Sequence, residues 1–274
     1  MEYQFQIFSP GGNDTALVFG LDFDKETERN IDFDIRSSHE TVEQVGFVGK
    51  TDKVYRLEMA GGEFCGNAAR CAASYFLKNT AGEIDIRVSG VTRTLKAGVR
   101  RIDTAWAAMP VNPNLDSVSV SDEGFCLVAL EGIVHLVIPP DKSGRFLSAA
   151  RSANSFEDEL KSIAKRLMDK YSLTKHPACG VMFPEDTADG LFLHPCVFVA
   201  GVESSMYYET ACGSGSIAVA AAFSFLNKDS IKLSVIQPSR RVIAAVVELS
   251  DERTVAGAYI DGAVVTDGRI VSVC

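Results

Sequence analysis

The sequence contains no apolar run that approaches the roughly 20 residues of a membrane-spanning helix, so we expect none. It has no cluster of lysine and arginine, and its formal net charge is −9, so neither a nucleic acid nor a membrane surface is an expected partner. The first residues enter a strand-like pattern directly, which predicts that there is no signal peptide. The seven cysteines have no regular spacing, and this favours a cytoplasmic location over a disulfide scaffold.

The glycines lack the strand-to-helix pattern that binds the phosphates of a nucleotide, so the sequence gives no sign of such a cofactor. The chain has 274 residues, of which 46% are hydrophobic and 23% are charged. This composition is ordinary for a globular protein, and the length is sufficient for two domains with substantial cores.

Two Cys-Gly steps each begin a run of small and apolar residues. The first motif is Cys-Gly-Asn-Ala-Ala-Arg at residues 65–70, and its run covers residues 68–77. The second is Ala-Cys-Gly-Ser-Gly at residues 211–215, with a run over residues 217–226. Both runs are rich in alanine and lack proline, so they predict two buried helices of about three turns.

Cys65 and Cys212 therefore lie at predicted helix N-termini, where unpaired N–H groups and the helix dipole favour a thiolate. A single cysteine is more often a buried, inert thiol. Two cysteines in matched Cys-Gly helix starts instead suggest a pair of catalytic groups that act on one substrate. Four further cysteines are assigned to structure: Cys71, Cys126, Cys196 and Cys274.

The order of predicted elements repeats along the chain as strands, a Cys-Gly step, a buried helix and more strands. We therefore predict an α/β (α+β) fold of two similar domains, each a mixed sheet or barrel wrapped around a central helix. The two helix N-termini are expected to meet at a shared cleft. A turn rich in proline and asparagine at residues 110–114 suggests domains of residues 1–116 with 263–274, and residues 117–262.

Other segments are less clear. Ser155 is predicted to cap a helix with an apolar stripe, whereas the acidic residues 21–40 permit no firm assignment. The glycine-rich turn at residues 9–14 is either a simple hairpin turn or a place where the backbone and Asn13 approach a ligand.

At the two cysteine motifs the sequence resembles the diaminopimelate epimerase family of cofactor-independent amino-acid racemases. Further matches are Gly-Asn-Asp at residues 12–14, His135 after Gly132, and the glycine-rich tail at residues 257–270. Within this family the chain is similar to the histidine racemase branch that supplies D-histidine for staphylopine-type metallophores. That similarity rests on residues 43–47, 62–68, 88–90, 134–139 and 237–238, and on Glu209.

The match to diaminopimelate epimerase itself is imperfect. That enzyme has an arginine for the distal carboxylate of its substrate before the second cysteine, where this chain reads Glu-Ser-Ser at residues 203–205. Asparagines of the family's pocket are replaced by Glu58, Ile133 and Ala178. A histidine racemase is therefore the expected enzyme, with diaminopimelate epimerase, a racemase of another amino acid, or an isomerase of a non-amino acid as alternatives.

The resemblance implies a two-base reaction on a small-molecule amino acid, with no cofactor and with Cys65 and Cys212 as the acid–base pair. Backbone N–H groups at both helix starts are expected to hold the α-carboxylate: Gly66, Asn67, Gly213 and Ser214. Glu43 is the first candidate partner for an imidazole, with His135 and Asn13 near the pocket. Glu209 either binds the substrate amino group or caps a turn.

Rival interpretations remain at this stage. A metal-binding protein is suggested by His-Pro-Ala-Cys at residues 176–179 and His-Pro-Cys at residues 194–196, but the spacings are irregular. A non-catalytic binder of the same fold would be favoured only if one of the two motif cysteines were missing. Relatives often form homodimers, so a homodimer is possible, although nothing in the sequence locates an interface.

Overall fold

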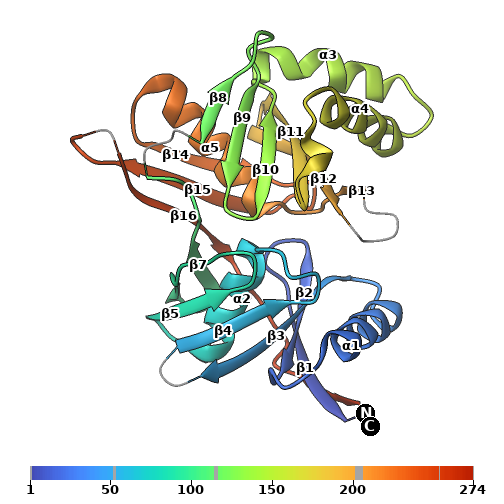
Figure 1. Ribbon diagram of the computed structural model, residues 1–274, viewed down its shortest axis with the longest axis vertical. Coiled ribbons are helices and arrows are strands. Elements are labelled where there is room, and N and C mark those ends of the chain that lie inside the picture. The colour runs from blue at the N-terminus through green and yellow to red at the C-terminus, as the bar shows by residue number, and fades with distance from the viewer. Residues whose placement is uncertain (1, 52–53, 114–116, 201–205, 253, 274) are drawn as a thin grey trace. The chain divides into compact units, whose positions relative to one another are not determined.

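The computed structural model describes residues 2–51, 54–113, 117–200, 206–252 and 254–273 (Figure 1). The chain divides into two compact units, Met1–Met109 with Ile260–Cys274, and Pro110–Tyr259. The domain boundary predicted after residue 116 falls outside the described residues, and the predicted second boundary, after residue 262, lies close to the return of the chain at Ile260. Each unit is described below by itself.

The first unit is a mixed sheet that encloses one helix, α2 (Gly66–Phe76). Antiparallel pairs alternate with the parallel pairs β2–β3 and β4–β5. The strands in order across the sheet are β17 (Ile270–Val273), β1 (Tyr3–Phe8), β2 (Asp14–Phe19), β3 (Val42–Thr51), β4 (Val54–Met59), β5 (Gly82–Val88), β6 (Leu95–Arg101) and β7 (Thr104–Ala108), and β7 also pairs with β16 (Val255–Ala263).

Helix α2 is the centre of the first unit, as the alanine-rich run predicts. Its residues from Gly66 to Ser74 are all buried, and it contacts the strands from β2 to β7. Small side chains allow the strands to approach the helix on every side, which a helix with one apolar stripe would not permit. The helix begins two residues before the predicted run because Cys65 is its N-cap.

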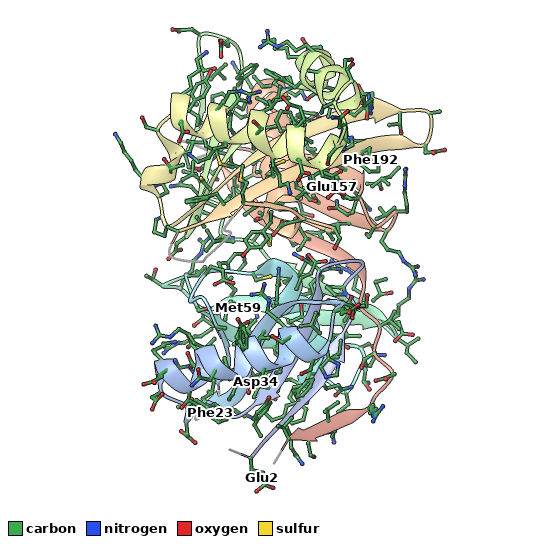
Figure 2. All side chains as sticks on the ribbon, turned by 90° about the vertical axis from the view of Figure 1, so that its right-hand side faces the viewer. Glu2, Phe23, Asp34, Met59, Glu157 and Phe192 are labelled. Atoms are coloured by element: carbon green, nitrogen blue, oxygen red, sulfur yellow. The ribbon has the colours of Figure 1, made fainter. Side chains whose placement is uncertain are left out.

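The acidic stretch that the sequence left unassigned contains helix α1 (Lys25–Ser38), which packs against β3. The Asp24 side chain accepts a hydrogen bond from the Thr27 N–H at 2.8 Å and so caps the first turn. Ile31 and Ile35, one turn apart, are its buried apolar residues. Asp34 is on the solvent-facing side, as Figure 2 shows. Most other positions are polar, so the helical period is hard to recognise in the sequence.

The second unit repeats the plan around helix α5 (Gly213–Asn227). Its strands are β8 (Val118–Val120), β9 (Cys126–Leu130), β10 (Ile133–Val137), β11 (Ala178–Thr187), β12 (Gly190–Val199), β13 (Met206–Tyr208), β14 (Ile231–Ile236) and β15 (Val242–Leu249). They pair in this order, except that β12 pairs with both β13 and β14, at different residues. The predicted fold of two similar domains, each a mixed sheet around a central helix, is thus confirmed.

Two further helices cover β11 on the outside of the second unit, α3 (Pro140–Arg151) and α4 (Phe156–Lys170), and a 3₁₀ turn follows at Leu173–Lys175 (Figure 1). Ser155 caps α4 by accepting from the Asp158 N–H at 3.3 Å, as predicted. Helix α3 was not predicted. Across the part of the chain that the structure describes, no helix is long and apolar enough to cross a membrane.

Candidate active site

Cys65 is the N-cap residue of α2, with extended backbone angles of φ −129° and ψ 111°. Its Sγ accepts a hydrogen bond from the Ala68 N–H at 3.3 Å. The sulfur therefore lies among the unpaired N–H groups of the first helical turn, where the helix dipole favours negative charge. Cys65 as a residue is only partly buried.

The second partner of this sulfur is Gln44 on β3, whose Oε1 accepts a hydrogen bond from the Cys65 thiol at 2.9 Å. A carboxamide offers an acceptor oxygen and a donor N–H₂ on one group, and rotation exchanges the two. Gln44 can therefore bind a thiol through its oxygen and a thiolate through its nitrogen. Gln44 belongs to the segment 43–47 that carries the resemblance, but no local pattern reveals its contact with a sulfur 21 residues away.

Asn67 and Asn13 lie in the same unit as Cys65, and both are buried, with exposed fractions of 1% and 3%. Arg70 connects their two segments, because one guanidinium nitrogen donates to Asn67 Oδ1 and to the Pro10 carbonyl oxygen, each at 2.8 Å. Asn13 has a positive φ of 59° at the end of the glycine-rich turn. The turn is thus packed against the first turns of α2 rather than projecting into solvent.

The segment that leads into Cys65 is held by the loop after β5. Ser89 Oγ donates to the Glu63 carbonyl oxygen at 2.7 Å and accepts from the Met59 N–H at 2.9 Å. Gly90 has φ +75°, and a Cβ added there would lie 2.5 Å from the Phe64 nitrogen. Only glycine fits this conformation and this close approach.

The corresponding place in the second unit is Cys212, the N-cap of α5, with φ −119° and ψ 102°. Its Sγ accepts from the Gly215 N–H at 3.2 Å and lies 3.6 Å from Ser214 Oγ. The two cysteines therefore share backbone conformation, cap position and hydrogen-bond pattern. Cys212 differs in being buried, with 2% of its surface exposed.

A buried polar network fixes the backbone of Cys212. Gln237 Oε1 accepts from the Cys212 N–H at 2.9 Å, and its Nε2 donates to Ser216 Oγ at 3.0 Å and to the Val235 carbonyl at 3.1 Å. Ser216 Oγ in turn donates to the Cys212 carbonyl at 2.7 Å. Gln237 was noted only as part of the resemblance, and the network depends on contacts that no local pattern reveals.

Burial and the neighbouring Glu209 raise the pKa of Cys212 well above its ordinary value, so this thiol keeps its proton at neutral pH. Desolvation is the larger cause, and the negative charge of Glu209 and a hydrogen bond to it act in the same direction. The Glu209 N–H donates to the Pro195 carbonyl at 3.1 Å, which anchors the residue to β12. Gly213, the other predicted residue of this helix start, is buried.

His135 lies on β10 in the second unit and is fully buried. Neither ring nitrogen has a hydrogen-bond partner within the described residues. Burial lowers the pKa of His135 to about 3, which keeps the imidazole neutral. Its predicted contact with substrate stays a prediction, as does that of Glu43, which is exposed on β3.

The remaining cysteines are kept neutral by burial, which raises the pKa of Cys71 and of Cys196 to about 12 and that of Cys179 to about 11. His194 belongs to one of the motifs that suggested a metal site. Its two ring nitrogens are instead hydrogen-bonded to Tyr208 Oη at 2.7 Å and to a Glu185 carboxylate oxygen at 3.2 Å. No group of three or more possible metal ligands is found within the described ranges. Two further predictions concern residues outside the described ranges. These are residues 203–205, where the arginine of diaminopimelate epimerase is missing, and Cys274.

Comparison with known proteins gives a consistent result. The family model described as "Histidine racemase CntK N-terminal domain" matches residues 2–270. A histidine racemase of Fusobacterium nucleatum subsp. nucleatum is 30% identical over 280 aligned positions, covering 97% of this chain and 96% of the relative. A histidine racemase of Staphylococcus aureus is 23% identical over 255 positions, covering 88% and 87%. The crystal structure of a hydroxyproline epimerase from Agrobacterium vitis has the same fold, with a TM-score of 0.64 at 14% identity over 99% of this chain and 92% of that one.

Proposed function

The chain belongs to the histidine racemase CntK family, and we propose that it interconverts L- and D-histidine with Cys65 and Cys212 as the acid–base pair. Family membership makes it an isomerase of the racemase and epimerase class. The observation that carries the assignment of the pair is the matched position of the two sulfurs. Each is an N-cap that accepts from the N–H three residues further on, at 3.3 Å and 3.2 Å.

The chemistry of racemisation explains why two such groups are needed. The α-proton of an amino acid is a very weak acid, and inversion requires its removal from one face of the α-carbon and the return of a proton to the other. One cysteine, as thiolate, takes the α-proton and becomes a thiol, while the electron pair of the broken C–H bond remains on the substrate. The other cysteine, as thiol, gives its proton to the opposite face and becomes the thiolate.

The helix starts supply the stabilisation that a cofactor would otherwise provide. In the transition state negative charge spreads from the α-carbon onto the α-carboxylate. Backbone N–H groups of Gly66, Asn67, Gly213 and Ser214 are the donors that would hold this carboxylate, and their hydrogen bonds strengthen as the charge develops. The proposed reaction therefore needs no pyridoxal phosphate.

Recognition of the imidazole is assigned to Glu43, with Asn13 and His135 as further contacts and Glu209 for the amino group. A carboxylate suits a ring that is partly cationic near neutral pH. Six free cysteines within the described chain support a reducing, cytoplasmic location. A homodimer stays a prediction, to be tested by light scattering on the purified protein.

The test is the exchange of the α-proton for deuterium in heavy water, followed by proton NMR. Wild type is compared with Cys65→Ser and Cys212→Ser over a panel of histidine, diaminopimelate, glutamate, aspartate and arginine. We expect exchange with histidine only, and exchange that is lost or limited to one enantiomer in each variant. Exchange with diaminopimelate instead would make the chain an ordinary diaminopimelate epimerase, and no exchange with any amino acid would reject the proposal.

A further inference from the structure

Arg70 is an unusual residue in this structure because its guanidinium is fully buried, with none of its surface exposed. Burial lowers the pKa of Arg70, yet arginine remains protonated at neutral pH. One nitrogen donates to the Pro10 carbonyl and to Asn67 Oδ1. The other two, Nε and Nη1, have no hydrogen-bond partner within the described part of the chain. A buried cation without a counter-ion is strongly unfavourable, so its charge needs an explanation.

The groups that affect Arg70 electrostatically are Cys71, Asp261 and Cys65. Cys71 cannot serve as the counter-ion, because burial raises its pKa to about 12 and keeps it neutral. Asp261, whose effect on Arg70 is larger than that of Cys65, is itself in an ion pair with Arg100 and is thus shared between two cations. Cys65 is the third of these groups and lies at the start of the same helix as Arg70, so a Cys65 thiolate would share the charge of Arg70 with Asp261 and with any carboxylate bound at the start of α2.

We propose that Arg70 is a positioning residue for the Cys65 half of the active site. Its buried charge stabilises the Cys65 thiolate, and its hydrogen bonds fix the orientation of the Asn67 side chain and the position of the turn that contains Pro10. The inference rests on the proposed function, because it assumes that Cys65 alternates between thiol and thiolate. In this role Arg70 acts through its charge and through Asn67 and Pro10, to which it is hydrogen-bonded.

The hydrogen bonds add a geometric effect to the charge. Because Asn67 Oδ1 accepts from the guanidinium, the N–H₂ edge of the same carboxamide is directed away from Arg70. The Pro10 carbonyl is bound by the same nitrogen, so the turn that carries Asn13 has a fixed distance from α2. A lysine would keep the charge at this place, but its single ammonium lacks the planar fork of arginine.

Three substitutions separate charge from hydrogen bonding. Arg70→Lys keeps the charge, Arg70→Gln keeps a neutral donor, and Arg70→Met keeps neither. The reaction of Cys65 with iodoacetamide is followed by mass spectrometry of its peptide from about pH 5 to about pH 10, since only the thiolate reacts. Lys96→Met, which removes an exposed cation from β6, is the matched control.

We expect the midpoint of the alkylation profile to rise by about one pH unit in Arg70→Gln and Arg70→Met, which slows alkylation roughly tenfold near neutral pH. Arg70→Lys and Lys96→Met should keep the wild-type midpoint. If Arg70→Met does not fold, as judged by circular dichroism, the comparison of Arg70→Gln with Arg70→Lys decides. Equal midpoints in these two variants and wild type would overturn the proposal.

The alkylation assay contains no substrate, so its outcome is independent of whether histidine is racemised. A chain that fails the deuterium-exchange test but shows the expected shift would refute the proposed function and retain the role of Arg70 towards the thiolate. For a chain that racemises histidine, Arg70→Lys should lower kcat less than Arg70→Gln does. It should also raise KM, because the position of Asn67 is lost. An unchanged KM in Arg70→Lys would reject the geometric part of the proposal.

Discussion

The substitution Gly90→Ala tests whether the loop after β5 positions Cys65. Gly90 has φ +75°, and its added Cβ would lie 2.5 Å from the Phe64 nitrogen and 2.8 Å from the Glu63 carbonyl carbon. Both atoms belong to the backbone, so no side-chain rotation relieves the overlap. Ordinary contact begins at 3.4 Å, and the segment must therefore move by about 0.9 Å.

Two other glycines provide controls with the same backbone angle. Gly62 and Gly268 both have φ +76°, and an added Cβ at either position meets nothing within 4 Å. An alanine in this conformation costs about 1–2 kcal/mol, of which roughly 0.4–1 kcal/mol is offset by the lower entropy of the unfolded chain. The controls should therefore lose about 1 kcal/mol, whereas Gly90→Ala should lose a further 1–3 kcal/mol from overpacking, about the range seen for enlarged buried residues.

The assays are urea denaturation for stability and racemisation of histidine for activity. Because a displacement of about 1 Å at a reacting group lowers the rate roughly 100-fold, Gly90→Ala should be at least tenfold less active than either control. Equal stability and activity in Gly90→Ala and Gly268→Ala would refute the argument that this close approach positions Cys65. If Gly62→Ala loses as much activity as Gly90→Ala while Gly268→Ala keeps it, the effect comes from the flexibility of the segment before Cys65 and not from the close approach.

Three further predictions concern the partners of the site. Gln44→Glu should lower kcat more than Gln44→Ala does, because a carboxylate repels the thiolate form of Cys65, whereas alanine only removes a hydrogen bond; steady-state kinetics on the two variants check this. Burial holds the pKa of His135 at about 3, below the 6.5 of an exposed histidine. Between these two values the unfolded chain binds a proton that the folded chain does not, so the free energy of unfolding is highest above pH 6.5 and decreases as the pH falls towards 3. His135→Leu should therefore remove a slope of about 1.4 kcal/mol per pH unit from the free energy of unfolding measured between pH 3 and pH 6.5. Gln237→Leu should lower the free energy of unfolding by about 1–3 kcal/mol in urea titrations, because it leaves a buried N–H without an acceptor, and an unchanged value would contradict the importance of this network.

The two central helices could be predicted because their evidence is local. Alanine-rich runs without proline indicate helices buried on all sides. The run at residues 217–226 lies inside α5, and the run at residues 68–77 lies inside α2 except for its last residue, which is the C-cap. Helices α1 and α3 were missed because each buries few residues on one side. In α3 these are Ser143, Leu147 and Ala150, of which one alone is a large apolar residue, so the helical period is almost absent.

The site was predictable only where the chain itself sets the geometry. A residue before a helix start becomes its N-cap, so Cys65 and Cys212 could be placed from the sequence. Their partners come from distant segments: Gln44 is 21 residues from Cys65, Gln237 is 25 residues from Cys212, and Pro10 is 60 residues from Arg70. Such pairings depend on strand order and register, which a single sequence does not specify.

The choice of sulfur at both caps itself argues for chemistry. Serine, threonine, aspartate and asparagine are the favoured N-cap residues because an oxygen accepts strongly from the N–H groups of the first turn. A thiol sulfur is a weaker acceptor than an oxygen, and it accepts the two cap bonds here at 3.3 Å and 3.2 Å. Helix stability alone would therefore favour serine at both positions, and Cys65→Ser and Cys212→Ser are expected to fold normally while their proton exchange is lost or limited to one enantiomer. The same weak acceptor in both units is best explained by the one property that serine lacks, a proton that can be given up and recovered near neutral pH.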